Sequence, residues 1–256
     1  MNNSYDHIEQ LVPGPGVDAE KLFEELFVGC DCPTAVCGEN CKCVQYTNKD
    51  KNYNDQGRLD KANTDTVVEC SDSCACALLP RSCGNRVVQN GIQVKLKMVS
   101  IINKGYGILA DETIKEGTFV CEYAGELISK EEVEKRHSAL SEDVLHNYTF
   151  TVVEHFGGTP KTSFIDARFR GNIARFVNHS CNPNLKPCIV RINSEAPHIA
   201  LFTSRQIEKG EEVCYDYGLS GEQDQVGSGE FRRAKRCYCG EAECRGFLPM
   251  SFTATS

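Results

Sequence analysis

The stretch "RFVNHSCNPN", from Arg175 to Asn184, contains one cysteine, Cys181, that stands two residues after a histidine and far from the other cysteine groups. Such a thiol is either a buried core residue, which is common for free cysteine, or a metal ligand with partners elsewhere in the chain. Near the end of the sequence, three cysteines lack the fourth ligand of a closed zinc site: Cys237, Cys239 and Cys244. Cys181 can supply it, and the zinc would then hold the C-terminal segment over any site that Asn178 and His179 help to form.

The sequence has 16 cysteines in 256 residues, so either disulfides or metals are expected to hold them. The N-terminus "MNNSYDHIEQLVPGPG" has neither a basic start nor an apolar stretch of signal-peptide length. It therefore shows no route to an oxidising compartment. Metal binding is favoured, and disulfides remain the alternative.

Nine cysteines lie between residues 30 and 83. Two separate zinc sites of four ligands would leave one thiol over, whereas three zinc ions need twelve coordination positions from nine sulfurs, so three sulfurs would bridge. Cys-x-Cys pairs suit bridging, because thiols two residues apart can reach neighbouring ions. We expect a structural three-zinc cluster from Cys30, Cys32, Cys37, Cys41, Cys43, Cys70, Cys74, Cys76 and Cys83. The block holds no histidine, so a finger-type DNA reader has little support.

The rest of the chain reads as a mostly β domain with few helices. Short β-branched and aromatic runs recur from residue 92 onward: "IQVKLKMVS", "TFVCEYAGELI", "NYTFTVV", "CIVRI" and "HIALFTS". One helix is predicted at "SKEEVEKRHSAL", where Ser129 and Glu132 fit a capping box. The remaining cysteines, Cys121, Cys188 and Cys214, lie in apolar or strand-like contexts and are predicted to be free core thiols.

Charge and hydropathy narrow the classes of partner. No apolar run approaches the ~20 residues of a membrane span, so a membrane protein is not expected. The formal charge of -8 argues against direct, nonspecific binding of nucleic acid and fits a basic partner that carries lysine or arginine, although mere solubility is an equal explanation. The segment "RRAKR" (Arg232 to Arg236) fits a nuclear signal or a solvated loop.

Several motifs, taken in order, resemble the pre-SET, SET and post-SET family of protein-lysine methyltransferases. They are "ECSDSCACALLPRSCGNRVVQNG", "NKGYGILA", "CEYAGELIS", "IDARFRGNIARFVNHSCNPN", "YDYG" and "CYCGEAECRG". Within the family they look most like the methyltransferase half of the SET–mariner transposase fusion protein. The resemblance implies a SET β-fold with a pseudoknot, flanked by a tri-zinc pre-SET region and a zinc-binding post-SET tail. It divides the chain into a lead-in (1–29), pre-SET cluster (30–91), SET catalytic domain (92–218), linker (219–236) and post-SET tail (237–256).

The resemblance also implies a nuclear, chromosomal enzyme that moves methyl groups from S-adenosylmethionine (SAM) to a lysine, on a histone H3 tail or another protein. Its cofactor residues would be Lys104, Gly105, Tyr106, Tyr148, Arg175, Asn178, His179 and Phe247. Its catalytic residues would be Tyr217, Tyr215 and Tyr148: Tyr217 would orient the amine and handle its proton, and Tyr148 would flank the transfer channel. A Tyr rather than a Phe at position 215 predicts mono- and dimethylation. Three alternatives remain open: a non-histone substrate, a catalytically silent chromatin-binding SET module, and a purely structural metal protein.

Overall fold

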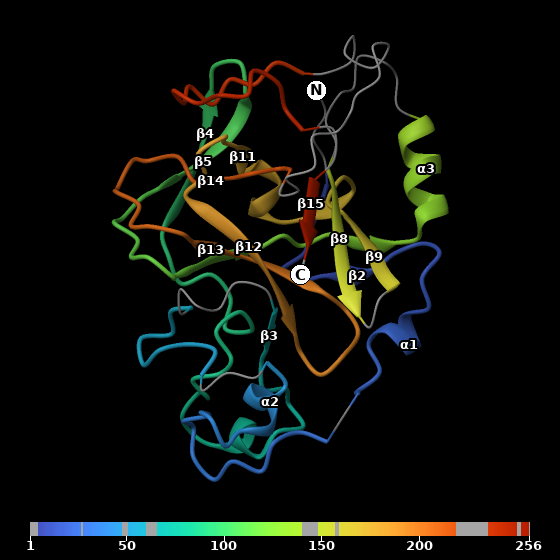
Figure 1. Cartoon of the computed structure of the whole chain (residues 1–256), viewed down its shortest axis with the longest axis vertical. Helices are drawn as coiled ribbons and strands as arrows, with labels where there is room; N and C mark the ends of the chain where they lie inside the picture. The colour runs from blue at the N-terminus through green and yellow to red at the C-terminus, as the bar shows by residue number, and fades with distance from the viewer. Residues whose placement is uncertain are drawn as a thin grey trace.

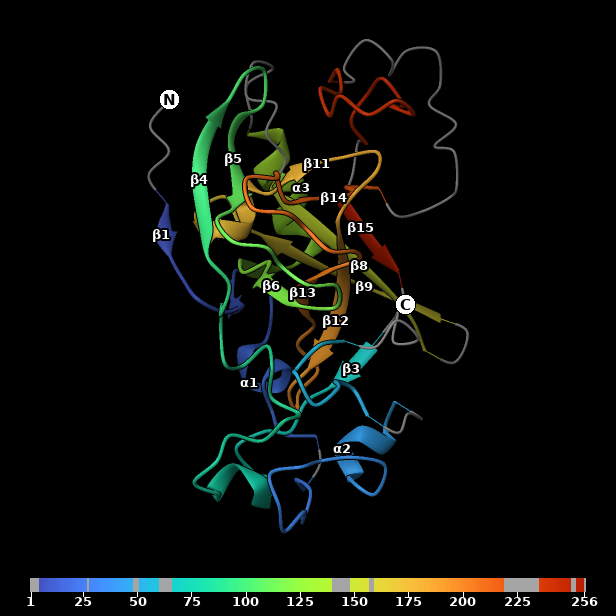
Figure 2. The same ribbon diagram turned by 90° about the vertical axis from the view of Figure 1, so that its left-hand side faces the viewer.

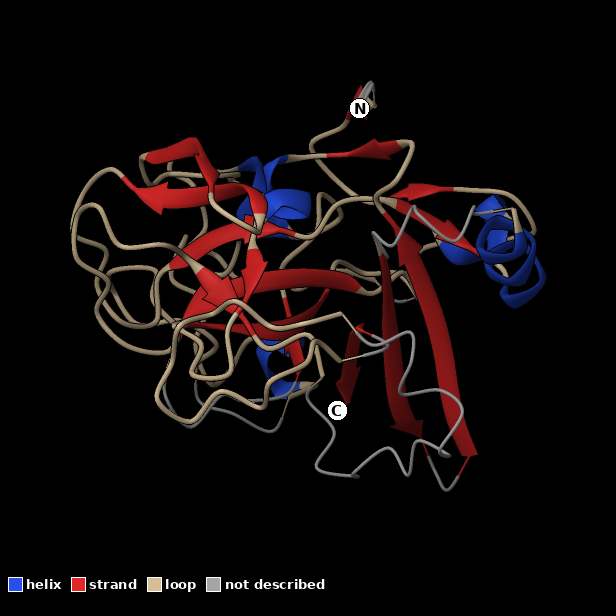
Figure 3. Cartoon of the chain, turned by 90° about the horizontal axis from the view of Figure 1, so that it is seen from above, coloured by secondary structure: helices blue, strands red, loops and turns tan. Residues whose placement is uncertain are grey.

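The computed structural model describes residues 5–26, 28–47, 51–59, 66–139, 148–156, 159–218, 235–249 and 252–255. Strands make up most of the regular secondary structure in these ranges, as Figure 3 shows, and the helices within them are short. The predicted mostly β architecture is confirmed. No helix in the described ranges is long and apolar enough to cross a membrane.

Two larger sheets form the body of the molecule (Figure 1). The first has the order β11 (Asn178–His179), β14 (Cys214–Tyr215), β12 (Leu185–Arg191), β13 (His198–Thr203) and β6 (Phe119–Glu122), with β3 (Thr66–Val68) also paired to β12. The second has the order β15 (Phe252–Thr255), β8 (Thr149–Phe156), β9 (Thr159–Asp166), β7 (Glu126–Ile128) and β2 (Val12–Pro13).

Smaller elements complete the fold. An antiparallel hairpin joins β4 (Leu96–Ile101) to β5 (Gly105–Ala110), and β1 (Asp6–His7) pairs in parallel with β10 (Arg170–Gly171). Figure 2 shows the hairpin and β1 along one side of the molecule. The helical pieces are α1 (Ala19–Leu22), α2 (Lys42–Gln45), α3 (Lys130–Ser138) and the 3-10 turns η1 (Ala75–Leu78) and η2 (Ile173–Phe176).

The main core contains apolar side chains from both larger sheets. Its largest fully buried members include Phe150, Ile165, Leu185, Ile199 and Leu201. Burying a side chain of this kind contributes about 1.5–3 kcal/mol relative to leaving it in water. The alternating apolar runs of the sequence therefore become the inner faces of strands, and this packing fixes the loops that carry the site.

Two similar stretches of sequence, each with an Ile three residues before a Gly, lie against each other. The backbones of Ile114 and Ile207 exchange hydrogen bonds of 2.8 and 2.9 Å. Gly117 and Gly210 have φ values of 76° and 88°, in a region that disfavours residues with a Cβ. Each glycine thus closes a turn that leads into a strand, one into β6 and the other toward β14.

Helix α3 begins at its predicted cap, but only half of the predicted capping box forms. The Ser129 hydroxyl accepts a hydrogen bond of 3.3 Å from the Glu132 backbone N–H. The Ser129 N–H donates to the Pro15 carbonyl, and the Glu132 carboxylate binds Arg136 at 3.0 Å instead of reaching back. Arg136 also contacts Glu126 and Asp166, each at 2.9 Å, so the helix is held to the sheet by a charge network.

Short N-terminal strands pair with strands from later in the chain. Residues 5–14, predicted as part of a lead-in, supply β1 and β2. The cysteine-rich region lies at one end of the molecule in Figure 1 and is joined to the body where β3 pairs with β12. The predicted boundaries between the five segments remain predictions, and most of the predicted linker, including residues 232–234 of the basic segment, lies outside the described residues.

Candidate active site and metal centres

The two motifs "NHSC" and "YDYG" lie side by side as parallel strands. In this pairing Asn178 of β11 is opposite Cys214 of β14, and His179 is opposite Tyr215. The Ser180 N–H continues the ladder by donating to the Tyr215 carbonyl at 3.2 Å. Stretches that are far apart in sequence therefore form one wall of a common site.

The last residue of "NHSCNPN" fixes this pairing. The Asn184 side-chain oxygen accepts a hydrogen bond from the Cys214 N–H at 2.8 Å, and its amide group donates to the Glu212 carbonyl at 2.8 Å. Asn184 is buried, with 4% of its surface exposed. Since a buried amide left unpaired costs about 1–3 kcal/mol, both bonds hold the strand that carries the tyrosines.

Four tyrosines gather behind this wall. The rings of Tyr215 and Tyr217 are 4.8 Å apart, and Phe150 of β8 stacks on Tyr215 at 5.9 Å. The Tyr217 hydroxyl donates to the Val177 carbonyl at 2.8 Å, and the Tyr123 hydroxyl donates to the Tyr148 carbonyl at 2.8 Å. The structure thus brings together the three tyrosines predicted to be catalytic, and adds Tyr123.

Burial sets the protonation state of these phenols. It raises the pKa of Tyr217, Tyr215 and Tyr123 above the ordinary tyrosine value, and neighbouring phenol, thiol and carboxyl groups add to the effect, while Arg175 opposes it at Tyr123. A phenol in this setting stays protonated at neutral pH. Tyr217 can therefore donate to Val177 and accept from another donor, but it is not a resident base.

A partly buried carboxylate, that of Glu212, links three of the predicted cofactor residues. Glu212 accepts 2.8 Å and 2.7 Å hydrogen bonds from Asn178 Nδ2 and Lys104 Nζ, and Asn178 also donates to the Tyr106 carbonyl at 3.0 Å. Although burial favours the neutral amine, the bond to Glu212 holds the pKa of Lys104 above its ordinary value. The turn at 104–106 and β11 are thereby fixed to each other.

His179 is buried between the two motifs and is neutral. Its burial, together with the nearby Arg245 and Lys104 charges, lowers its pKa to about 4 despite the proximity of Asp216. The Tyr217 N–H donates to Nδ1 at 3.2 Å, so the proton belongs on Nε2, which lies 3.3 Å from the Cys181 sulfur. Nε2–H can thus donate to a thiolate at Cys181.

The C-terminal cysteines meet Cys181 as predicted. The sulfurs of Cys181, Cys237, Cys239 and Cys244 all lie within 4.8 Å of one another. Although burial acts in the opposite direction, hydrogen bonds from the backbone amides of Cys181 and Glu241 lower the pKa of Cys239 to about 7. Four converging sulfurs, one already inclined to ionise, are compatible with a structural zinc site.

An ion pair reinforces this junction. Arg245, next to Cys244, lies 2.6 Å from the Asp216 carboxylate, and its backbone N–H donates to the Cys181 sulfur at 3.4 Å. The Asp216 carboxylate also accepts from the Gly218 N–H at 3.0 Å. The tail is therefore attached to both motifs of the site, independently of any metal.

The N-terminal cysteines form three overlapping groups. Their sulfurs approach one another at 3.5 to 3.9 Å, close to the ~3.8 Å edge of a tetrahedron built on Zn–S bonds of about 2.3 Å. The groups are Cys30, Cys43, Cys70 and Cys74; Cys30, Cys37, Cys41 and Cys70; and Cys37, Cys70, Cys76 and Cys83. Sharing of sulfurs between groups is the arrangement that a bridged cluster requires, and the donor set is compatible with zinc.

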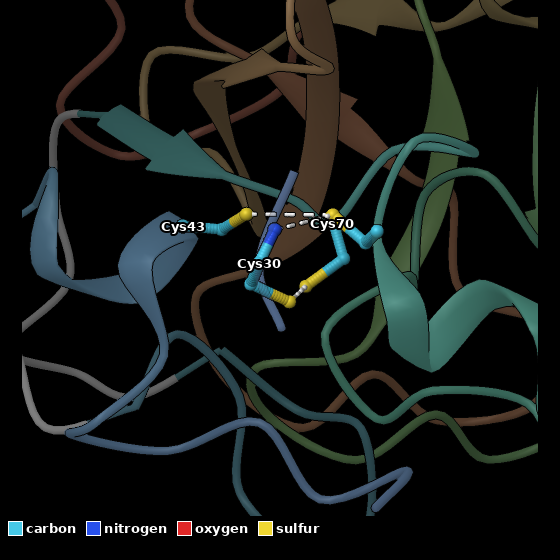
Figure 4. Close-up of side chains that lie close together, drawn as sticks. Cys30, Cys43 and Cys70 are labelled. Carbon is cyan, nitrogen blue, oxygen red and sulfur yellow. Dashed lines mark hydrogen bonds between the residues drawn. The ribbon is translucent and has the colours of Figure 1, made fainter. Parts of the chain in front are cut away.

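Figure 4 shows Cys30, Cys43 and Cys70 converging from separate segments of the chain. Cys70 belongs to all three groups, and the buried Asn85 amide donates to its sulfur at 3.3 Å. Cys32 is in none of the groups, but its thiol interacts with those of Cys30, Cys37 and Cys41. Thus eight of the nine predicted ligands converge within ligand range, and the ninth lies beside them.

The structure also places three predicted core thiols and two predicted cofactor residues. Cys121, Cys188 and Cys214 are buried outside the metal groups, as predicted, and burial raises the pKa of Cys121 to about 12. Gly105 begins β5 with a φ of 85°, in open space where a backbone can meet a ligand. Phe247 is half-exposed and its backbone pairs with Arg236, so its place over a cofactor stays a prediction.

Sequence reasoning did not single out four residues that the structure places in the site: Tyr123, Glu212, Asp216 and Arg245. All four lie inside the motifs that carry the family resemblance or close to them in sequence. Their polar side chains gave a signal, but which partner each would reach depends on strand pairings between distant segments.

Comparison with known proteins identifies the class that this fold and site define. Residues 105–218 match the model of the SET domain, and residues 2–86 match that of the Pre-SET motif. The chain belongs to the SET-domain family, which confirms the predicted resemblance.

Individual relatives extend over almost the whole chain. The probable histone-lysine N-methyltransferase set-23 of Caenorhabditis briggsae is 47% identical over 249 residues, covering 97% of this chain and 98% of the relative. The methyltransferase domain of human histone-lysine N-methyltransferase SETMAR has a TM-score of 0.79 at 33% identity, covering 99% of this chain and 91% of that domain. A structure of KRYPTONITE with mCHH DNA, H3(1-15) peptide and SAH has a TM-score of 0.74 at 27% identity, covering 96% and 48%.

Proposed function

We propose that this chain transfers methyl groups from SAM to a lysine of histone H3, and that it acts in the nucleus on chromatin. The chain is a SAM-dependent protein-lysine methyltransferase of the SET family, and its relatives are histone enzymes by name. The observation that carries the mechanism is the buried tyrosine cluster beside the Asn178–Glu212–Lys104 network. The choice of H3 is supported by the structural neighbour with an H3 peptide and SAH, the demethylated form of SAM.

The residues of β11 and the neighbouring turn at 104–106 are suited to bind SAM. When bound, SAM supplies an electrophilic methyl group on a positively charged sulfonium. The 104–106 turn and Asn178 offer backbone and amide groups that Glu212 holds in place, and His179 is fixed by Tyr217 and Cys181. We assign these residues to the cofactor, together with Tyr148 and Arg175 and, less directly, Phe247.

Tyr217 is assigned to the lysine amine. Its O–H proton is engaged by the Val177 carbonyl, so toward the amine the phenol oxygen can only accept. An amine N–H held there leaves the nitrogen lone pair for the methyl group. Burial of the amine away from water, beside the buried Tyr215 and Phe150 rings, disfavours an ammonium, as does the positive charge of the sulfonium, and both lower the pKa of the substrate lysine.

This assignment predicts the pH profile. A substrate lysine with an ordinary pKa of about 10.4 becomes neutral as the pH rises, so kcat/KM should increase about tenfold per unit between pH 7 and 9. The pKa of Tyr217 is raised, so its phenol stays protonated. No fall in kcat/KM should therefore appear at any pH below the ordinary tyrosine pKa of about 10. The measurement is initial rates on an H3 peptide, with circular dichroism as the folding control. A decline that begins below pH 9 in folded protein would contradict the role of a neutral phenol.

The number of methyl groups is proposed to depend on Tyr215. Its buried ring stacks on Phe150 and packs at a tilt against Tyr217, and its hydroxyl can hold the amine, or a water beside it, in space that a dimethylamine needs. We expect mono- and dimethyl-lysine from the native protein. Tyr215→Phe keeps the ring and should shift the product toward trimethyl-lysine, measured by mass spectrometry after exhaustive turnover. Abundant trimethyl product from the unmutated chain would contradict this proposal.

We also propose four zinc ions per chain, three in the N-terminal cluster and one at Cys181. Cys30 and Cys37 each belong to two of the N-terminal groups and Cys70 belongs to all three, and a three-ion cluster of nine sulfurs requires sulfurs that are shared between ions. Metal analysis of the purified chain should return four zinc ions, and chelation should unfold the cysteine-rich regions and abolish activity. Two zinc ions or fewer in folded protein would rule out the cluster.

Removal of Cys181 tests the tether between the tail and the site. Cys181→Ser should weaken SAM binding more than it lowers the melting temperature, because the N-terminal cluster stands apart from this junction. Isothermal titration with SAM and thermal unfolding give the two values. The matched control is Cys188→Ser, which changes a buried thiol outside the metal groups and should lower stability without a selective loss of SAM binding. Normal SAM binding by Cys181→Ser would end the tether proposal.

Two alternatives can be distinguished by measuring methylation and SAM binding with the same purified chain. The first is methylation of a non-histone protein, and the second is a silent SET module that binds chromatin. Purified chain in zinc buffer is incubated with labelled SAM and H3 peptides in which individual lysines are replaced by arginine. Methylation lost with one replacement supports H3, automethylation or methylation of other proteins alone supports the first alternative, and failure to bind SAM supports the second.

A further inference from the structure

Arg175 of η2 is a buried cation with an unused hydrogen-bonding group. Only 8% of the residue's surface is exposed. Its Nε donates to the Ala167 carbonyl at 3.0 Å and Nη2 approaches the Arg168 carbonyl at 3.5 Å. Nη1 is buried and has no hydrogen-bond partner within the described residues. A buried Nη1 group without an acceptor is costly, so a ligand that brings an acceptor to Nη1 would be favoured.

Three aromatic rings surround this guanidinium. The centroids of Tyr5, Tyr148 and Phe176 lie 4.2, 4.4 and 4.9 Å from its central carbon. Rings at this distance exclude water and attract the cation through their π faces. The nearest ring, that of Tyr5, comes from the N-terminal segment, about 170 residues away in sequence.

The N-terminal strand is fixed where Tyr5 meets Arg175. The backbone N–H groups of Asp6 and Ile8 donate to the carbonyls of Phe169 and Gly171 at 2.8 and 2.9 Å. The Tyr5 ring also packs edge-on against Phe176 at 5.9 Å, and Phe176 packs against Tyr106 at 6.0 Å. A row of rings thus runs from the N-terminal strand to the turn assigned to the cofactor.

We propose that Tyr5 is a positioning residue for cofactor binding: it holds the Arg175 guanidinium so that Nη1 binds the carboxylate of SAM. The inference rests on the proposed function, since it takes SAM as the ligand. The carboxylate is the one anionic group of SAM, and guanidinium–carboxylate pairs are strong when the guanidinium is fixed and shielded from water. The N-terminal strand is then part of the cofactor site.

The test compares SAM with decarboxylated SAM, which lacks only that carboxylate. Dissociation constants are measured by isothermal titration on the full chain and on Tyr5→Leu, which keeps an apolar side chain but removes the π face. Loss of the cation–π contact should weaken SAM binding about three- to tenfold. Binding of decarboxylated SAM should stay within about twofold, and Tyr5→Phe should restore the native value for SAM. His7→Ala, two residues further along the N-terminal segment and exposed, is the matched control and should bind both ligands normally.

Kinetics provide a second readout. Tyr5→Leu should raise the KM for SAM and leave kcat at saturating SAM unchanged, because Tyr5 acts through Arg175 and does not contact the amine. If Tyr5→Leu weakened the binding of SAM and decarboxylated SAM equally, the role of Tyr5 would be merely structural. If it weakened the binding of neither, Tyr5 would have no role in cofactor binding. Either result overturns the inference. If the native chain bound no SAM, the proposed function itself would fail. Should Tyr5→Leu not fold, Tyr5→Met gives the same comparison.

Discussion

The parallel pairing of β11 with β14 is the constraint on which the rest of the site depends. It places Asn178 and His179 against Cys214 and Tyr215, and each of the two short strands is too small to persist alone. Asn184 stabilises the pair from one end by bonding to the Cys214 N–H, and Tyr217 does so from the other by bonding to His179. If this pairing slipped by one residue, the tyrosines would turn to the opposite face and the cofactor network would lose its carboxylate.

Burial acts on the two partners of the reaction in complementary ways. The same apolar surroundings that raise the pKa of Tyr217 would lower that of a substrate lysine, since each shift follows from the cost of charge in a medium with little water. A neutral phenol and a neutral amine are then both favoured. The site thus uses tyrosines to orient and desolvate the amine, and the proton can leave to water before the lysine is enclosed.

The sequence was sufficient for what depends on local pattern. The strand runs and the helix at 130–138 with its Ser129 cap follow from local spacing and residue type, whereas the convergence of Cys181 with the three C-terminal cysteines was predicted from the four ligands that a closed zinc site needs. The contacts of Glu212 and Arg245 were not foreseeable in this way, because each side chain chooses among several partners only after distant strands have paired. Glu132 shows the same limit at close range: a helix neighbour, Arg136, outcompetes the expected backbone partner for its carboxylate.

The cysteine-rich region can stabilise the site even though it lies at the far end of the molecule in Figure 1. Its strand β3 adds to β12, and the Glu69 N–H extends the ladder to the Arg191 carbonyl at 2.9 Å. The Arg191 guanidinium then meets both oxygens of the buried Glu154 at 2.6 Å, and Glu154 belongs to β8, which carries Phe150 under Tyr215. A buried pair of this kind adds little net stability but is costly to break, so it specifies one register. Closing the cysteine cluster therefore favours the same strand alignment that places the aromatic wall of the site.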